Sequence, residues 1–235
     1  ITTCRVCNSG NLTPILSLGD LYISDFLSEQ EKGEAEHAPL ELVLCNKQEG
    51  GCGLLQLKHT VSSEAMYLRY WYRSGTNATM VTELHGIANK VESLVDLTSG
   101  ESVIDIGAND GTLLRGYKKQ GINLIGFEPA KNLGEYNSVG TTKIINDFFN
   151  ARAWRETLGS VKAKAITAIA MFYDLDDPNM FVDDVVKCLD DEGVFIIQMS
   201  YLPLMLSQNE LGNICHEHLE YYSLLSLEHL LSRHN

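Results

Sequence analysis

Five short runs of apolar and β-branched residues alternate with segments of helical character from residue 100 onward. The runs cover residues 102–107, 123–129, 142–149, 163–172 and 192–200. The segments between them cover residues 112–120, 131–139, 151–158 and 179–189. This alternation predicts an α/β fold, in which helices cover both faces of a parallel sheet. Because crossovers in such sheets are right-handed, the carboxyl ends of the strands meet at one edge, where we expect a ligand to bind.

The first of these runs ends in a glycine-containing turn, VIDIGANDGTLL. Asp105 lies on the expected strand, Gly107 begins the turn, and Gly111 leads into the expected helix. A dinucleotide-binding turn reads G-x-G-x-x-G and directs a helix N-terminus at pyrophosphate. Here Asn109 replaces the middle glycine, and the carboxylate of Asp110 would repel pyrophosphate. The turn therefore argues against a nicotinamide oxidoreductase and suits a ligand that carries an amine and a sulfonium.

The next strand ends carry side chains that suit the rest of such a ligand. Glu128 ends the second run, where a carboxylate can bind both hydroxyls of a ribose. Asp147 and Phe148 end the third run and suit the amine and the ring face of adenine, although Asp147 is also consistent with a helix cap. Ala170, after the fourth run, is small enough to line the reacting end. Together these residues predict a site for S-adenosylmethionine.

Four of the six cysteines fall in the first fifth of the chain, as Cys4-x2-Cys7 and Cys45-x6-Cys52. The N-terminus lacks a charged-then-apolar leader, so we expect a cytoplasmic protein with reduced thiols. Residues 1–60 are rich in turns and too few to form a good core unaided. Four thiolates form a complete tetrahedral set for structural Zn²⁺. The six-residue gap is longer than usual, and two redox pairs or buried thiols are the alternatives.

Residues 61–98 show the spacing of a helix with one buried face. Met80, Leu84, Ile87, Val91 and Leu94 recur every three or four residues.

An aromatic stretch, MYLRYWYRSGTN, precedes this pattern. Aromatic faces attract a sulfonium by cation–π interaction, so Tyr70 and Tyr72 are candidates for a place near the cofactor or the reacting groups. Packing in a core is the alternative. Arg73 is a candidate for a phosphate contact, and an exposed arginine without such a role is equally consistent with the sequence.

The segment ICHEHLEYYS follows the last strand run and concentrates ionisable side chains. An imidazole has the pKa of a general base near neutral pH, and a neighbouring carboxylate can orient it. We expect an extended or loop segment before a final helix capped by Ser226, with His216 and His218 on one face and Glu217 on the other. We assign His218 as the base and Glu217 as its helper. A solvated cluster or a second metal site is the alternative, although the absence of HExxH excludes a zinc-peptidase arrangement.

These motifs together resemble a known family. VIDIGANDGTLL, GFEPA, INDFF and IAMFYDLDDP look like a class I S-adenosylmethionine-dependent methyltransferase. With the four cysteines, YWYRSGTN and ICHEHLEYYS, the chain is similar to the sugar C-methyltransferases that act on nucleotide-linked 4-keto deoxysugars. The resemblance implies a Rossmann-like, doubly wound sheet, the cofactors S-adenosyl-L-methionine and Zn²⁺, and a small-molecule substrate of the nucleotide-sugar class. It also implies a base within residues 216–222, the HEHLEYY segment.

The expected organisation is a zinc-binding module at residues 1–60, a connector covering the cofactor site at 61–98, and a methyltransferase core at 99–235. In the resembled family a further carboxy-terminal domain follows, so we expect a chain truncated before it. A formal net charge of −13 argues against a nucleic-acid partner, and no apolar run is long enough for a membrane span. An O- or N-methyltransferase of another small metabolite, and a catalytically inactive zinc and Rossmann binding module, are the rival hypotheses.

Overall fold

The computed structural model describes residues 1–23 and 36–234. These residues form two compact units, and each is described by itself. Unit 1 comprises Ile1–Met66, Phe172–Val182 and Met199–Asn235, and unit 2 comprises Tyr67–Met171 and Asp183–Gln198. Among the helices in the described ranges, none combines the length and the apolar character needed to cross a membrane.

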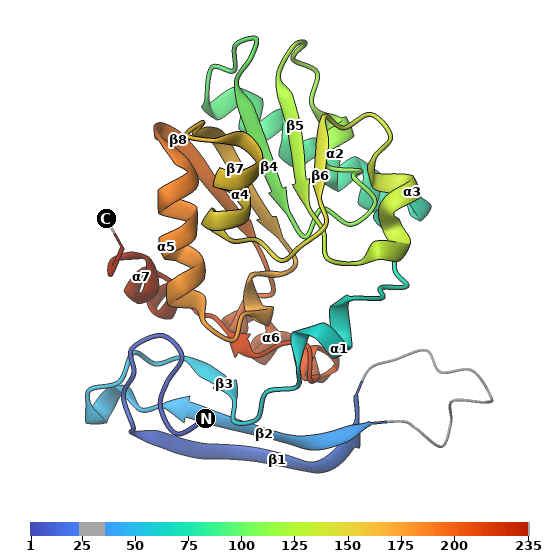
Figure 1. Ribbon diagram of the computed structural model, residues 1–235. Helices are drawn as coiled ribbons and strands as arrows, with labels where there is room; N and C mark the ends of the chain where they lie inside the picture. The colour runs from blue at the N-terminus through green and yellow to red at the C-terminus, as the bar shows by residue number, and fades with distance from the viewer. Residues whose placement is uncertain (24–35, 235) are drawn as a thin grey trace, which may run out of the picture. The chain divides into compact units, whose positions relative to one another are not determined.

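Unit 2 is built on a five-stranded parallel sheet (Figure 1). Its strands are β4 (Ser102–Ile106), β5 (Asn123–Phe127), β6 (Lys143–Ile145), β7 (Ala163–Ile169) and β8 (Leu189–Gln198). The spatial order is β6-β5-β4-β7-β8, so the chain runs outward in both directions from β4 and β7. This order confirms the predicted α/β class and places the point where the strand order reverses between the ends of β4 and β7.

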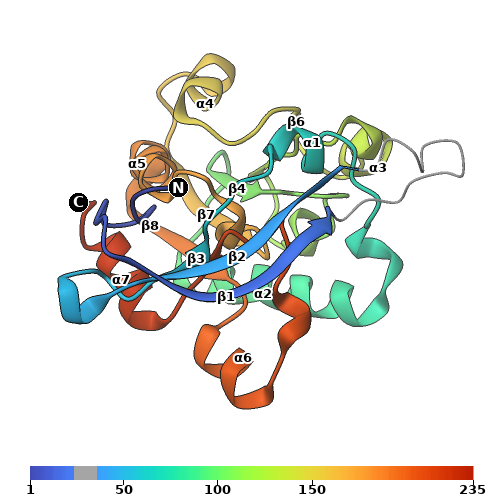
Figure 2. The same cartoon turned by 90° about the horizontal axis from the view of Figure 1, so that it is seen from below.

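Helices cover both faces of this sheet, as a doubly wound fold requires. Helix α2 (Ala78–Leu94) lies on one face and α4 (Ala151–Leu158) on the other (Figures 1 and 2). Helix α5 (Pro178–Cys188) belongs to unit 2 from residue 183, and α3 (Gly134–Asn137) is a single turn. The side chains of Asn77 and Asn150 accept backbone N–H bonds at the starts of α2 and α4, which is the usual role of asparagine as an N-cap.

The buried face of α2 is narrower than the sequence pattern predicts. Leu84 and Val91 are buried, together with Ala88, but Met80 is 37% exposed and Leu94 is 49% exposed. The helix also begins only at Ala78, because residues 68–73 have no helical structure. The expectation of a continuous helical face through residues 61–98 is therefore wrong at its two ends.

The expected helix at residues 112–120 is also absent from the structure. Only a short 3-10 turn forms, at Leu114–Gly116. Gly116 lies directly under α2, since a Cβ there would come within 2.9 Å of the Cα of His85. The backbone N–H groups of Lys118 and Lys119 both donate to Glu92 of α2, at 2.8 Å. Helix α2 thus packs where the first crossover helix was expected, over a core that includes Leu113, Leu114 and Val103.

Unit 1 contains an antiparallel sheet that the turn-rich sequence did not indicate. Its strands are β1 (Leu12–Tyr22), β2 (His37–Cys45), β3 (Leu55–Leu57) and β9 (Glu220–Tyr221), in the order β1-β2-β3-β9. Its helices are α1 (Ser63–Tyr67, of which Tyr67 falls in unit 2), α6 (Leu202–Gln208) and α7 (Leu224–Leu231). The fourth strand comes from the far end of the sequence, so the N-terminal segment and the HEHLEYY segment share one sheet.

A compact apolar core joins these segments of unit 1. Leu40, Leu42 and Leu57 of the sheet pack with Met205 of α6 and with residues of the HEHLEYY segment. The final helix begins one turn earlier than expected, because Ser223 is its N-cap and exchanges hydrogen bonds with Ser226 in a capping box. The prediction that Ser226 itself is the cap is therefore wrong.

Candidate functional site

The four N-terminal cysteines converge in unit 1. The Sγ atoms of Cys4 and Cys52 lie 3.6 Å apart, and those of Cys7 and Cys45 lie 3.4 Å apart. One Sγ from each residue lies within 4.8 Å of all the others. Burial raises the pKa of Cys45 to about 11, whereas a hydrogen bond from Cys52 lowers the pKa of Cys4 to about 4. A tetrahedral Zn²⁺ fits this donor set.

The long gap between Cys45 and Cys52 has a local explanation. It contains a 3-10 turn at Lys47–Glu49 that ends at Gly50, whose φ of +85° is in the left-handed region. Gly51 then passes so close to the thiol of Cys45 that a Cβ at this position would lie 2.5 Å from the Sγ atom. Only glycine allows the backbone to approach the sulfur cluster in this way. The six-residue spacing between Cys45 and Cys52 is therefore compatible with a metal site.

The zinc-binding turn is also tied to the HEHLEYY segment by a buried ion pair. Arg5 lies between Cys4 and Cys7 in the sequence, and its Nε is 3.7 Å from the carboxylate of Glu220 in β9. Its Nη1 donates to the carbonyl of Leu57 at 2.6 Å. Burial raises the pKa of Glu220 well above its usual range, although Arg5 acts in the opposite direction. This contact could not be predicted from local sequence patterns, because it joins residues at opposite ends of the chain.

In unit 2, the turn after β4 lies where the strand order reverses. Three residues of this turn have a positive φ: Gly107 at +68°, Asn109 at +50° and Gly111 at +79°. A Cβ on Gly111 would meet the carbonyl oxygen of Asn137 at 3.1 Å. Gly107 faces Met171 beyond the end of β7, with a Cβ predicted to lie 3.4 Å from the Met171 Cγ. The turn is thus compact and exposes the backbone of Gly107 at the edge of the sheet.

Two carboxylates, Asp105 and Glu128, lie at the base of this turn. Thr167 donates its hydroxyl to Asp105 at 2.7 Å, and burial raises the pKa of Asp105 to about 7. Glu128 accepts the backbone N–H of Asn109 at 2.7 Å and that of Ala130 at 2.8 Å. Burial still raises the pKa of Glu128 to about 7. Each oxygen of Glu128 has a second lone pair, so the carboxylate can bind two hydroxyls besides holding the turn.

The aromatic stretch is fastened to the same turn by its backbone. Asn109 accepts the N–H of Ser74 at 3.0 Å and donates to the carbonyl of Tyr72 at 2.9 Å. Asn132, in the 3-10 turn Lys131–Leu133 after β5, both accepts the N–H of Tyr70 and donates to its carbonyl. Asn132 was not among the predicted site residues, since a single asparagine carries no distinctive signal in the sequence. The side chain of Tyr72 is 45% exposed.

Asp110 of the same turn also binds the aromatic stretch. It is buried, and its Oδ2 accepts the N–H of Gly75 at 2.8 Å. Its Oδ1 accepts the hydroxyl of Thr112 at 2.6 Å. The carboxylate of Asp110 thus fastens the aromatic stretch to the turn after β4. The Arg73 guanidinium lies 4.0 Å over the ring of Tyr136.

The remaining predicted cofactor residues lie at the ends of β6 and β7. Asp147 is exposed and accepts the N–H of Phe148 at 2.8 Å; it does not cap α4, because Asn150 does. Phe148 is half-buried. Ala170 is exposed with a φ of +53°, and its N–H donates to the carbonyl of Gln198 in β8. All the predicted cofactor residues therefore belong to unit 2.

The two histidines of the HEHLEYY segment, in unit 1, have different surroundings. His216 is buried, and its Nε2 donates to the carbonyl of Ala38 in β2 at 2.9 Å. His218 is half-buried, and its Nδ1 donates to the carbonyl of Asn213 at 2.8 Å. Its ring packs edge-on against Tyr173, with centroids 4.3 Å apart. Burial lowers the pKa of His218 below its usual 6.5, which favours the neutral ring. Because Nδ1 carries the proton that it donates to Asn213, the lone pair of the neutral ring lies on Nε2.

Glu217 lies on the same side of this turn as His218. A carboxylate oxygen of Glu217 and a ring nitrogen of His218 lie within 4.8 Å of each other and of the Sγ atom of Cys215. The expectation that Glu217 faces away from His218 is therefore wrong, because residues 215–217 form a turn rather than an extended strand. Burial raises the pKa of Glu217. Cys215 was not among the predicted site residues, as an isolated cysteine gives no signal by itself.

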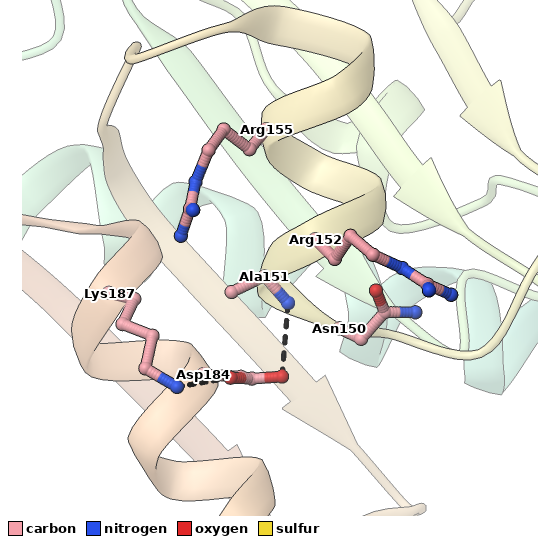
Figure 3. Close-up of a pocket in the computed structure, with 6 residues that line it drawn as sticks. All are labelled: Asn150, Ala151, Arg152, Arg155, Asp184 and Lys187. Atoms are coloured by element: carbon pink, nitrogen blue, oxygen red, sulfur yellow. Dashed lines mark hydrogen bonds and ion pairs between the residues drawn. The ribbon is translucent and has the colours of Figure 1, made fainter.

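A separate hollow lies between α4 and α5 in unit 2 (Figure 3). Arg152, Arg155 and Lys187 line it, which gives it a positive character. Asp184 accepts the backbone N–H of Ala151 at 3.0 Å and the Nζ of Lys187 at 2.8 Å. The carboxylate thus takes the place of an anion at the start of α4, and none of the predicted site residues lines this hollow.

Comparison with family models assigns most of the chain. A model described as "Methyltransferase domain" matches residues 80–235. A second model, for a zinc-binding domain, matches residues 4–67, which include all four clustered cysteines.

Individual methyltransferases are also similar to this chain, in sequence or in fold. The C-methyltransferase NovU of Streptomyces niveus is 25% identical over 237 residues, which cover 100% of this chain and 56% of NovU. Among solved structures, the plantazolicin methyltransferase BamL, in complex with a triazolic desmethylPZN analog and SAH, has a TM-score of 0.52 and 18% identity over 66% of this chain and 62% of its own. The plantazolicin methyltransferase BpumL, in complex with SAH, has a TM-score of 0.52 and 15% identity, over 68% and 66% of the two chains.

Proposed function

The chain belongs to the family of methyltransferase domains, and from this premise we propose that it methylates a carbon atom of a small molecule with S-adenosylmethionine as the methyl donor. NovU, with which the whole chain aligns, is a C-methyltransferase. The chain spans just over half the length of NovU. The observation that carries the proposal is the state of His218, whose Nδ1 is engaged and whose Nε2 holds a lone pair.

In this proposal, unit 2 holds the cofactor at the carboxyl edge of its sheet. Glu128 binds the ribose hydroxyls, the backbone at Gly107 lies beside the amino acid end, and Asp147 and Phe148 bind the adenine. Asp105 supports the turn from below through Thr167. When bound, the cofactor supplies an electrophilic methyl group on a sulfonium. The fold similarity to methyltransferases solved with SAH supports a site at this edge.

The proton chemistry falls to the HEHLEYY segment of unit 1. Carbon becomes a nucleophile when a proton beside a carbonyl is removed, which leaves the electron pair in an enolate. His218 accepts that proton on Nε2, because its lowered pKa keeps the ring neutral near pH 7. Asn213 fixes the tautomer through Nδ1. Glu217 stabilises the imidazolium that results, which is the role proposed for it as a helper.

His216 fits a supporting role in this scheme. Its Nε2 is engaged with β2 and its side chain is buried, so it anchors the segment rather than accepting a proton. Tyr70 and Tyr72 remain candidates for contacts with the cofactor or the enolate oxygen, because their backbones are fastened to the turns of unit 2. The proposed substrate class is a nucleotide-linked keto-deoxysugar, which provides the acidic C–H that this chemistry needs.

The experiment that tests this function compares proton exchange with methyl transfer. The protein is incubated in D₂O with a nucleotide-linked 4-keto deoxysugar, first without and then with S-adenosylmethionine, and products are followed by mass spectrometry. Deuterium uptake beside the ketone, followed by methyl transfer to that carbon, supports the proposal. Methyl transfer without any exchange would favour an O- or N-methyltransferase. Cofactor binding with neither reaction would favour the inactive binding module.

Replacing Glu128 with glutamine is expected to weaken binding of S-adenosylhomocysteine by about 10- to 150-fold, since a hydrogen bond to a charged group contributes about 1.5–3 kcal/mol. Glutamine keeps one acceptor oxygen for the turn but loses the charge and one acceptor. Calorimetric titration measures the affinity, and Glu135→Gln, at an exposed acid of the same unit, is the matched control. Equal affinities of the two variants for S-adenosylhomocysteine would show that Glu128 does not bind the ribose.

The pH dependence of turnover follows from the state of His218. Because burial lowers its pKa below 6.5, the neutral base persists into mildly acidic solution. We expect kcat to be flat near neutral pH and to fall as the pH drops through a midpoint below 6.5, where the ring becomes protonated and can no longer accept a proton. A kcat profile with its acid limb above pH 7 would contradict the assignment of His218.

A further inference from the structure

The turn that carries His218 brings three metal-ligating side chains together. Cys215 Sγ, a carboxylate oxygen of Glu217 and a ring nitrogen of His218 lie within 4.8 Å of one another. The backbone N–H of His218 closes the turn by donating to the carbonyl of Cys215 at 3.3 Å. All three side chains are half-buried, so solvent reaches them. This cluster lies outside the four-cysteine site and shares no residue with it.

The ligand types match borderline divalent cations of the zinc class. Thiolate, imidazole and carboxylate all bind Zn²⁺, whereas Mg²⁺ and Ca²⁺ prefer oxygen ligands alone. Three protein ligands leave a fourth position for water, which distinguishes an open site from the closed four-cysteine set. The three ligand atoms lie within 4.8 Å of one another, close enough to converge on one ion.

An outer layer around the cluster also suits metal binding. Metal-ligating histidines usually donate their other N–H to a backbone carbonyl or carboxylate, which fixes the ring. The Nδ1 of His218 donates to the Asn213 carbonyl at 2.8 Å, and the hydroxyl of Tyr221 donates to the same oxygen at 3.3 Å. The Cys215 thiol points toward this oxygen too, at 3.9 Å. One carbonyl thus orients the imidazole, and Nε2 keeps the lone pair that a metal needs.

We propose that Cys215, Glu217 and His218 form a second, open binding site for a zinc-class cation, and that an ion bound there inhibits the enzyme. Binding releases the thiol proton to solvent and engages the lone pair of His218. The inhibition rests on the proposed function, because it requires His218 to be the base. The binding of metal does not, since it depends only on the three ligands.

The test uses Co²⁺ as a spectroscopic probe of the protein preloaded with one equivalent of Zn²⁺. We expect a further equivalent of Co²⁺ to bind with a thiolate-to-cobalt absorption band. Cys215→Ala should lose the band and this equivalent. Cys188→Ala is the matched control, because Cys188 is a buried cysteine outside both clusters, and it should keep them. Metal analysis after gel filtration confirms that the first Zn²⁺ is retained in every variant.

Activity then tests the consequence for the base. Excess Zn²⁺ should inhibit methyl transfer by the control variant Cys188→Ala and should inhibit Cys215→Ala much more weakly, at equal affinity for S-adenosylhomocysteine. Failure of the zinc-loaded protein to bind an equivalent of Co²⁺, or an identical spectrum in Cys215→Ala, would overturn the site. Binding of Co²⁺ together with equal inhibition of both variants would overturn the regulatory role. If no keto-sugar is methylated at all, the proposed function fails while the cobalt titration still decides the site.

Discussion

Replacing His218 with glutamine is expected to lower kcat for methyl transfer by about 10²–10⁴-fold, the range that a positioned general base contributes. Glutamine can still donate to the Asn213 carbonyl that the ring now contacts, so the turn has a partner for its side chain. It cannot accept a proton near neutral pH. Turnover of a keto-sugar nucleotide, measured with saturating cofactor, gives kcat.

Two further measurements separate a lost base from a damaged fold. Affinity for S-adenosylhomocysteine should be unchanged in the His218 variant, because the predicted cofactor residues lie in the other unit. His229→Gln, at an exposed histidine of α7, is the matched control and should keep full turnover. If deuterium exchange beside the ketone persists in the His218 variant and disappears in His216→Gln, the base is His216 instead.

Loss of the zinc ligand Cys45 is expected to have the largest effect on stability. At free zinc about 1,000-fold above the dissociation constant, binding contributes about 4 kcal/mol to the folded state. For a chain of this size, that corresponds to a fall in melting temperature of roughly 8–16 °C. Cys45→Ser should show this fall together with the loss of one zinc per chain, measured by calorimetry and metal analysis. Cys188→Ser should keep its zinc and melt close to the parent protein.

The Cys45→Ser variant should also affect the two units differently, with turnover lost and cofactor binding retained. His216 donates to β2, and Glu220 pairs with β3 and with Arg5 of the zinc-binding turn. Without the metal, this anchoring is lost, so turnover should fall even where the protein is still folded. Binding of S-adenosylhomocysteine by unit 2 should remain. Loss of cofactor binding in step with zinc would contradict this division.

The α/β sheet was predictable because its signals are local. Each of the five strands overlaps one of the predicted runs, and helices α4 and α5 follow the expected segments within one residue at each end. The failures have physical causes. Residues 112–120 read as a helix, but Gly116 and the packing of α2 leave room only for a short turn.

The candidate site was predictable in its residue types and less so in its contacts. The four cysteines converge as their number and compartment suggested. The contacts of Asp110, Asn132 and Arg5 were not foreseen, since each joins segments far apart in the sequence. The proximity of Glu217 to His218 was missed for a different reason. Successive side chains point to opposite faces of a strand, whereas they can lie on one side of a tight turn. The sequence His-Glu-His is compatible with either conformation.

The pairing of β9 with β3 has a consequence for how the polypeptide is assembled. Gln56 and Glu220 are neighbours in one sheet but lie about 160 residues apart in the sequence, and contacts of such separation slow folding. All four zinc ligands, by contrast, lie within the first 52 residues. During synthesis, the metal can therefore be captured long before the last strand leaves the ribosome. We expect the zinc-loaded segment to form first, with β3 as an unpaired edge strand. Strand β9 pairs with β3 only after the residues between them, including the parallel sheet, have been synthesised.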